Sequence, residues 1–446
     1  MPRNREMIDG SGPLGPSPAM SKGSSMRASA ATRGLLTSRP FVTLLAARTL
    51  SMLGLSFSPV ALAFGVLALP HSGAGELSIV LASQMVPLVA FLLVGGVVAD
   101  RYPRSRVLLA GALLSALAWG TIGLMFLSGW APLWALCTAA AFAGLAGAPV
   151  YPALNGIIPD LVPVEHRQQG NAWLAMGASG ARLAGLVAGG AMVVWLGGGW
   201  AMIAAGGMYL GAAILVSTLP RVADTLADSE TSPLRQLIEG WSEFSSRRWL
   251  WATVAQWAVM IMVLQAANGV LGPVIAETEL GGAGVWTTVL AAEALGAVVG
   301  VALSMVWHPR RPILAATLLT LSAGLPALLL GVSAPVWTVV AAAFVAGIGF
   351  DLFGVWWMTT MQDEVPAESL SRVASYDALG SLMLGPVGLA LAGPAAVVFG
   401  AHASLVGAGL IALAATVFTL SVPEVRTLRA RRHTVADPGD VLVPTS

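Results

Sequence analysis

Twelve apolar segments, each long enough to cross a membrane as a helix, constrain the fold of this chain more than any other feature. An α-helix rises 1.5 Å per residue, so about 20 apolar residues cross a hydrocarbon layer about 30 Å thick. The segments lie at residues 41–66, 77–99, 106–127, 131–153, 170–195, 199–219, 249–272, 284–306, 312–333, 336–359, 373–396 and 400–421. Hydrophobic residues make up 56% of the chain and charged residues only 10%. The sequence therefore predicts an all-α membrane protein with twelve transmembrane helices.

The distribution of arginine predicts how the helices are oriented. Lys and Arg close to the ends of membrane helices remain on the cytoplasmic side. If the N-terminus is cytoplasmic, every loop arginine falls on that side, and the opposite loops carry only Glu76, Glu277 and Glu279. We therefore expect a multi-pass protein with both termini in the cytoplasm. The strong preference for Arg over Lys is typical of a GC-rich bacterial genome and favours the inner (plasma) membrane of a bacterial cell.

The chain divides into two similar halves and three polar parts. Residues 1–40 form a leader rich in Pro, Gly and Ser that we expect to be disordered. Residues 41–219 and 249–421 each hold six segments, and we expect two six-helix bundles related by a pseudo-twofold axis. The connector 220–248 places Leu234, Leu237, Ile238 and Trp241 at helical spacing, which predicts an amphipathic helix on the membrane surface. Residues 422–446 are expected to form a cytoplasmic tail. Duplicated bundles are typical of secondary transporters, whose substrate binds between the halves.

A dense charge cluster follows the second segment in the stretch GGVVADRYPRSRVLLAG at 95–111. Gly96, Asp100, Arg101, Arg104 and Arg106 resemble the signature G-x-x-x-D-R-x-G-R-R of the major facilitator superfamily, with Pro103 and Ser105 as departures from it. A degraded counterpart, GVALSMVWHPRRP, follows the eighth segment. The stretches PALNGIIPDLVP and DEVPAESLSRVAS resemble the branch that contains bacterial siderophore and macrolide exporters.

The resemblance implies the major facilitator fold and a gating role for this cluster. In the superfamily the acid accepts hydrogen bonds from the N-terminus of the eleventh helix, here near Arg372 to Ser375. Such a contact of Asp100 would close the cytoplasmic gate in the outward-facing state. The alternative is that the arginines only anchor the topology.

Several charged residues lie inside the apolar segments, where each costs on the order of 3 kcal/mol. Arg182, Glu293 and Asp351 are the deepest, and Arg48 and Asp377 lie closer to the cytoplasmic ends. In the superfamily the fifth and eighth helices are neighbours, so Arg182 and Glu293 would pair. Glu293 would then carry a proton, or the two residues would form a static ion pair. Asp351 is either the proton site or a partner of Arg48.

Small residues in the fifth segment also bear on the direction of transport. The stretch GARLAGLVAGG resembles the G-P-x-x-G-G element of drug-exporting antiporters, since Gly185, Gly189 and Gly190 match, whereas Leu186 replaces the proline. Close helix packing explains the same glycines equally well. The element favours export.

The candidate substrate cavity follows from the helices that line it in the superfamily, which are the first, fourth, seventh and tenth. Their polar and aromatic residues, with one from the second segment, are Ser56, Ser58, Gln84, Tyr151, Gln265, Asn268, Trp356 and Trp357. So few hydrogen-bonding side chains suit an amphiphilic organic molecule better than a sugar.

The sequence lacks the residues needed for an ATP-binding loop, a disulfide, a metal site or a nucleic-acid-binding surface. Lys22 is the only lysine and has no glycine-rich loop around it, Cys137 is the only cysteine, and the five histidines lack ligand spacing. A net charge of +1 provides no nucleic-acid surface. We therefore expect no enzyme activity, no cofactor, no metal and no nucleic acid.

The sequence therefore favours a proton-coupled exporter of an amphiphilic drug, antibiotic or siderophore that works by alternating access. Its partners would be the small-molecule substrate, protons and the lipid bilayer, and we expect a monomer. The alternatives are a solute importer on the same fold, and a membrane sensor or lipid-handling protein that transports nothing.

The predicted topology can be tested by labelling of single cysteines in a Cys137→Ala background. In intact cells, a membrane-impermeant maleimide should label Cys at position 71 (His71→Cys) and should leave Ser105→Cys unlabelled until the membrane is permeabilised. Labelling of Ser105→Cys from outside would contradict the predicted orientation.

Overall fold

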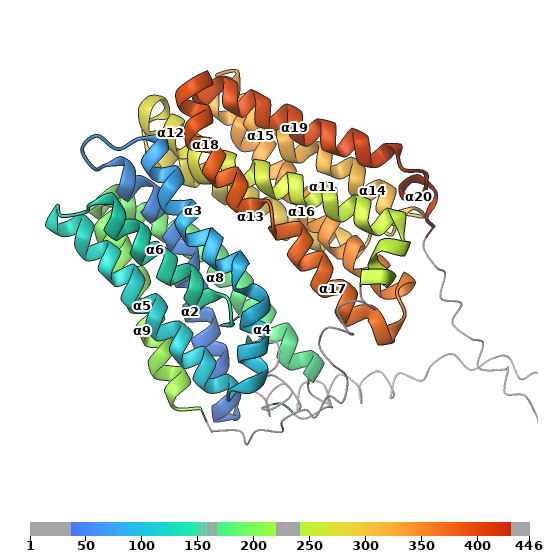
Figure 1. Cartoon of the computed structure of the whole chain (residues 1–446), viewed down its shortest axis with the longest axis horizontal. Coiled ribbons are helices and arrows are strands. Elements are labelled where there is room, and N and C mark those ends of the chain that lie inside the picture. Colours follow the sequence, from blue (N-terminus) through green and yellow to red (C-terminus); the bar gives the residue numbers. More distant parts are fainter. Residues whose placement is uncertain are drawn as a thin grey trace, which may run out of the picture.

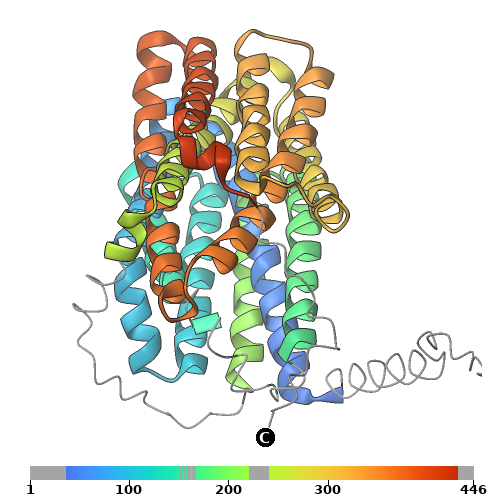
Figure 2. The same ribbon diagram turned by 90° about the vertical axis from the view of Figure 1, so that its right-hand side faces the viewer.

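The computed structural model describes residues 37–150, 153, 154, 157, 162, 167–219 and 241–429, and the regular elements in these residues are all helical. Figure 1 shows two helical bundles, and Figure 2 shows their helices running in a roughly common direction. Most of the predicted tail lies outside the described residues, as do nearly all of the predicted leader and most of the connector with Leu234, Leu237 and Ile238, whereas the first part of the tail is described and includes a short helix at Pro423–Thr427.

The first bundle contains α2 (Arg39–Leu67), α3 (Ala74–Ala90), α4 (Leu92–Arg101), α5 (Arg104–Ser128), α6 (Leu133–Gly147), α8 (Arg167–Leu196) and α9 (Gly198–Ser217). The second bundle begins with α11 (Arg248–Leu264), which continues through η2 (Gln265–Leu271), α12 (Gly272–Ile275) and η3 (Ala276–Leu280). It goes on with α13 (Ala283–Ser304), α14 (Pro312–Leu319), η4 (Thr320–Gly324), α15 (Leu325–Gly331), α16 (Val336–Glu364), α17 (Ala367–Leu382), α18 (Gly385–Phe399), α19 (Ala401–Ser421) and α20 (Pro423–Thr427).

These elements occupy the twelve predicted segments, and the all-α, twelve-helix prediction is confirmed. Ten helical stretches of the described chain are long and apolar enough to cross a membrane, and α3 and α6 are shorter apolar helices. The second segment is divided at Phe91, whose backbone angles (φ −96°, ψ 3°) depart from the helical values. The eleventh segment begins at Ala367 after Pro366, six residues before the predicted start at residue 373.

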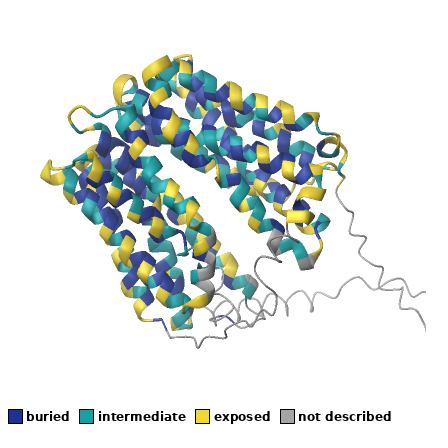
Figure 3. Cartoon of the chain, in the orientation of Figure 1, coloured by how far each residue is buried: buried dark blue, intermediate teal, exposed yellow. Residues whose placement is uncertain are grey.

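Many large apolar side chains are exposed on the surface of the bundles. Val397, Trp195 and Trp337 are 78%, 81% and 73% exposed. Figure 3 shows exposed residues along the outer sides of both bundles. Trp130, Trp134, Trp195, Trp200 and Trp337 all lie at helix ends on one side of the protein. Because Trp collects at membrane interfaces, they indicate where the lipid headgroups lie.

The two ends of the molecule differ in charge. We call the end with Arg39, Arg101, Arg104, Arg106, Arg248, Arg310 and Arg311 the arginine-rich end, and the end with the five tryptophans the opposite end. The sequence predicts that the arginine-rich end is cytoplasmic.

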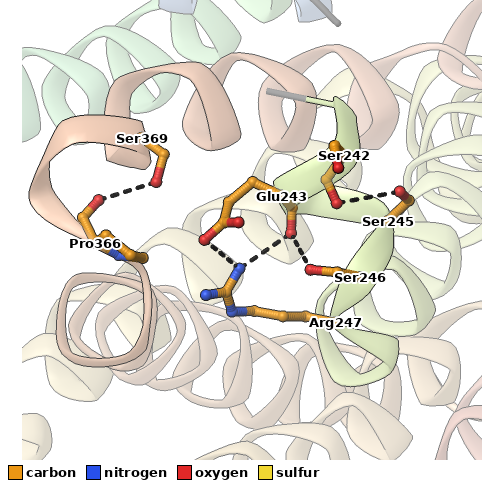
Figure 4. A network of polar contacts seen from close by, with 7 residues as sticks. All are labelled: Ser242, Glu243, Ser245, Ser246, Arg247, Pro366 and Ser369. Atoms are coloured by element: carbon orange, nitrogen blue, oxygen red, sulfur yellow. Dashed lines mark hydrogen bonds and ion pairs between the residues drawn. The ribbon is translucent and has the colours of Figure 1, made fainter. Parts of the chain in front are cut away.

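The last part of the connector packs on α17 at the arginine-rich end. Residues 241–246 are helical, and the rings of Trp241 and Phe244 lie 5.6 and 5.8 Å from the ring of Tyr376. Figure 4 shows the neighbouring polar contacts, in which Arg247 forms a 2.8 Å ion pair with Glu243. The connector therefore joins the second bundle as a packed segment from Trp241 onward.

Glycines allow α13 and α16 to approach closely. A Cβ at Gly296 would lie 2.0 Å from the carbonyl oxygen of Phe344, and a Cβ at Gly347 would lie 2.0 Å from that of Glu293. A Cβ at Gly300 would lie 2.5 Å from the carbonyl oxygen of Ile348. Each obstacle is backbone, which cannot turn aside, so the contact requires glycine at all three positions.

The glycine contact can be tested by stability measurements. Gly296→Ala should lower the free energy of unfolding by about 1–3 kcal/mol, because the added methyl group overpacks the contact between α13 and α16. Gly407→Ala is the matched control, since a Cβ at Gly407 on α19 has no neighbour within 4 Å. Thermal unfolding of the purified proteins in detergent measures both. Equal melting temperatures for the two variants would contradict the proposed packing constraint.

Candidate functional site

At the opposite end, the hydroxyl group of Ser78 joins the two bundles by hydrogen bonds to the backbone of α18. Ser78 on α3 is 1% exposed, and its hydroxyl donates to the carbonyl oxygen of Leu389. The N–H of Gly393 donates to the same hydroxyl at 3.2 Å. Leu389 and Gly393 are four residues apart and would normally bond to each other within a helix. Ser78 therefore bridges one turn of α18.

Small residues make this contact possible. A Cβ at Gly393 would lie 2.7 Å from the Cβ of Ser78 and 2.9 Å from the carbonyl oxygen of Ala74. Further along, Gln265 Nε2 lies 2.8 Å from Met85 Sδ, which adds a second link between the bundles. On the other side of the interface, a Cβ at Gly190 would lie 2.0 Å from Thr287 Oγ1. The bundles therefore meet closely along α3–α18 and α8–α13.

Helices of the two bundles stand apart at the arginine-rich end. Figure 1 shows α4, which carries Gly96 and Asp100, separated from the first turns of α17, which carry Arg372. Arg101 and Arg106 are exposed. The structure thus has the opposite end closed and these two helices apart. The contact of Asp100 with the start of α17 stays a prediction.

The three deepest charges lie near one another, on both sides of the interface between the bundles. Glu293 on α13 is half-buried and accepts a hydrogen bond from Asn268 Nδ2 at 3.3 Å. Arg182 on α8 is exposed and interacts electrostatically with both Glu293 and Asp351. Within the described part of the chain, no direct ion pair joins Arg182 to either carboxylate. The predicted pair is therefore close, but its charges are not in contact in this state.

Arg48 lies away from this cluster. It lines a cavity of about 260 Å³ inside the first bundle, between α2, α3, α5, α6 and α9, together with Gln84 and Ser115. Asp351 instead lines a cavity in the second bundle and has Arg182 as its electrostatic partner. The structure thus places Arg48 and Asp351 in separate cavities, in different bundles.

The predicted cavity residues are divided among several places. Ser56 and Ser58 donate to the carbonyl oxygens of Met52 and Gly54 in their own helix, at 2.8 Å each. Trp356 is buried against Trp307, with ring centroids 4.9 Å apart. Trp357 lines the second-bundle cavity, and Tyr151 lies outside the described residues. Asn268 and Gln265 are the members of the set at the interface between the bundles.

Two of the three glycines in α8 serve packing within the first bundle. A Cβ at Gly185 would lie 3.0 Å from the carbonyl oxygen of Leu53, and one at Gly189 would lie 3.0 Å from the Cα of Phe57. Only Gly190 faces the second bundle, through Thr287. The glycine stretch therefore joins α8 to α2 on one side and to α13 on the other.

Sequence reasoning did not single out Ser78, although it is the residue that connects the bundles. A single serine in an apolar segment carries no distinguishing spacing, and its partner lies 311 residues away. Pro386 and Pro394 flank the bridged turn of α18, but prolines inside an apolar segment do not identify a contact between the bundles.

Comparison with known proteins identifies the fold. The model of the Major Facilitator Superfamily matches residues 41–383. A crystal structure of the nucleoside transporter NupG is similar with a TM-score of 0.65 at 12% identity, covering 87% of this chain and 99% of that one. A POT family transporter in complex with 5-aminolevulinic acid gives 0.68 at 13%, covering 87% and 97%.

A bacterial homologue of the human lysosomal transporter Spinster, in an inward-facing and unoccupied conformation, gives a TM-score of 0.62 at 15% identity, covering 89% of this chain and 99% of that one. At these identities the likeness concerns the fold alone. No curated protein matches the sequence of this chain.

The Ser78 bridge can be tested by its effect on the conformational equilibrium. Ser78→Ala removes the bridge, and the open form of the opposite end should gain about fivefold in population, which corresponds to about 1 kcal/mol for one hydrogen-bonded group. Spin labels at His71→Cys and Phe399→Cys, in a Cys137→Ala background, report the distance across that end by pulsed electron resonance.

Ser83→Ala is the matched control, because Ser83 lies on the same helix and its hydroxyl forms no hydrogen bond with the described residues of α18. If Ser78→Ala and Ser83→Ala give the same distance distribution, the bridge does not hold that end closed.

Proposed function

Because the chain belongs to the Major Facilitator Superfamily and is a secondary transporter rather than an enzyme, we propose that it exports an amphiphilic organic molecule in exchange for protons. The observation that carries this proposal is the position of Glu293. It lies in the middle of a membrane helix, beside Asn268 and facing the cation Arg182 of the other bundle. A carboxylate in this position is costly unless it has a function or a permanent partner.

The spacing of the charges favours a proton carrier over a static ion pair. A permanent clamp would hold Arg182 in direct contact with Glu293, whereas Arg182 is exposed in this structure. A proton on Glu293 neutralises the carboxylate and removes its attraction to Arg182. When Arg182 approaches, its positive charge favours the deprotonated carboxylate. We propose that Glu293 takes up a proton when the bundles are apart at this level and releases it when Arg182 approaches. The free energy of rearranging the bundles then depends on whether a proton is bound.

The lining of the interface supports an amphiphilic substrate. Ser56 and Ser58 use their hydroxyls within their own helix, which leaves Gln265 and Asn268 as the main hydrogen-bonding groups of the predicted set near the interface. A sugar needs many more partners for its hydroxyl groups. An apolar molecule with one or two polar groups fits this lining.

The direction of transport follows from sequence resemblance. The stretches after the fourth and tenth segments resemble siderophore and macrolide exporters, and the glycine stretch of α8 resembles that of drug-exporting antiporters. We propose that Asp100 on α4 completes the cycle by contacting the start of α17 when the arginine-rich end closes. The protein would act as a monomer in the inner membrane, with both termini cytoplasmic.

Transport assays in proteoliposomes test the function. With an imposed proton gradient, the wild-type protein should move at least one fluorescent amphiphile from a panel of ethidium, rhodamine 6G and a dye-labelled macrolide. Glu293→Gln should abolish the dependence of flux on the gradient, because the amide cannot take up or release a proton. Glu277→Gln is the matched control, since Glu277 is exposed at the opposite end of the second bundle.

Gradient-driven flux at the wild-type rate in Glu293→Gln would exclude its role as carrier. Vesicles of known orientation separate export from import, because only export loads the lumen of everted vesicles. A protein that moves none of the panel under any gradient would support the sensor or lipid-handling alternative.

A further inference from the structure

A second cavity lies within the second bundle and includes Asp351 of the charge cluster described above. It measures about 220 Å³ and is lined by residues of α11, α16 and α17. Two of its lining residues are the carboxylates Asp351 and Asp377, and four are the aromatic residues Trp257, Phe350, Phe353 and Trp357. Acidic and aromatic side chains thus line one space within the second bundle.

The two carboxylates differ in their partners. Asp377 accepts a hydrogen bond from Trp357 Nε1 at 3.2 Å and another from Ser381 Oγ at 3.4 Å, one on each oxygen. No cation among the described residues forms an ion pair with Asp377. Asp351 interacts at longer range with Arg182 and with Glu293. The described side chains around the cavity therefore provide two acids and no cation in direct contact with either of them.

The aromatic rings form a stacked wall. The rings of Trp257 and Phe353 are 4.3 Å apart and nearly parallel at 4°, and those of Phe353 and Trp357 are 6.0 Å apart at 15°. Phe350 packs against Trp257 with ring centroids 4.8 Å apart. The π-electrons of aromatic rings attract cations, and this attraction strengthens when water is excluded. The rings also bury alkyl groups, so the wall suits an organic cation better than a hydrated metal ion.

The size of the cavity limits what can enter it. Sites for complete drug-sized ligands measure about 300–1,000 Å³, which is larger than the 220 Å³ here. A substituted ammonium group fits this smaller space, while the remainder of an amphiphile would extend out of it.

We propose that this cavity binds the substituted ammonium headgroup of an organic cation, with Asp351 and Asp377 balancing its charge and the aromatic wall enclosing its alkyl groups. The use of the site in transport rests on the proposed function, in which the bound cation is the transported amphiphile. Binding itself can be measured without transport.

Choline and 3,3-dimethylbutan-1-ol are suitable probes, because they have nearly the same shape and differ in charge. Equilibrium binding of radiolabelled choline to the purified full-length protein in nanodiscs should saturate, and the neutral alcohol should compete at least tenfold more weakly than unlabelled choline. Asp377→Asn and Asp351→Asn should each weaken choline binding at least tenfold, and Phe350→Leu should weaken it severalfold. Asp363→Asn, on the same helix as Asp351 and outside the cavity, should bind choline as the wild type does.

Equal competition by the neutral alcohol, or wild-type choline affinity in both Asp377→Asn and Asp351→Asn, would overturn the proposal. Melting temperatures of the variants in the same nanodiscs separate loss of the site from loss of the fold. If Asp377→Asn is unstable, Phe350→Leu and Asp351→Asn decide the outcome. Proton-driven flux of another amphiphile without choline binding would refute the site and leave the proposed function standing. Choline binding without any proton-driven flux would support the cation site and refute the proposed function.

Discussion

The close approach of α13 to α16 positions the charged groups on which the second bundle depends. Gly347 places the backbone of α16 against the carbonyl of Glu293, and Asp351 follows one helical turn after Gly347. Gly296 packs against the carbonyl oxygen of Phe344 and Gly347 packs against that of Glu293. Because both of these contacts are with backbone atoms, the two helices cannot slide past each other without losing them. Glu293 and Asp351 thus come from different helices but lie at fixed positions relative to each other, and a movement of the bundle carries both carboxylates together. The glycines of α13 and α16 therefore fix the positions of Glu293 and Asp351 relative to each other within the membrane, where buried charges are costly.

The contact at the opposite end has to be strong enough to close the protein and weak enough to open. The Ser78 bridge meets both conditions, because it consists of two hydrogen bonds to backbone atoms of a helix that is continuous from Gly385 to Phe399. Leu389 and Gly393 are four residues apart in this helix, so their backbone groups can bond to each other when Ser78 withdraws, and neither is left without a partner in lipid. The cost of opening is then small compared with the cost of an unsatisfied backbone group. Gly393 is needed in the closed form because any larger side chain would collide with α3.

Periodicity and charge were sufficient to predict the segments and the fold, because burial in lipid requires long apolar runs and the motif at Asp100 is specific. They were not sufficient to place individual polar residues. The direction in which Ser56 and Ser58 point depends on helix rotation, and both hydroxyls turn to their own backbone. The sequence places Asp377 close to the cytoplasmic end of its segment, but it does not show that Trp357 and Ser381 donate hydrogen bonds to its carboxylate. Arg48 and Asp351 were considered partners on sequence alone, and only the three-dimensional arrangement separates their cavities. Such details depend on contacts between residues far apart in the chain, which a single sequence does not encode in any local pattern.

Arg182 connects the two acidic sites of the second bundle, since it interacts electrostatically with both Glu293 and Asp351. Unit charges several ångströms apart interact by on the order of 2–4 kcal/mol at an effective dielectric constant of 20. An ammonium group between Asp351 and Asp377 would neutralise part of the charge that attracts Arg182 from that side. Arg182 would then be drawn more strongly to Glu293, which favours release of the proton. The coupling is reciprocal, so a proton on Glu293 leaves Arg182 to Asp351 and weakens the hold of that site on a cation. One arginine shared by two carboxylate sites therefore provides a physical reason for proton and organic cation to bind alternately, which is the requirement for exchanging one for the other across the membrane.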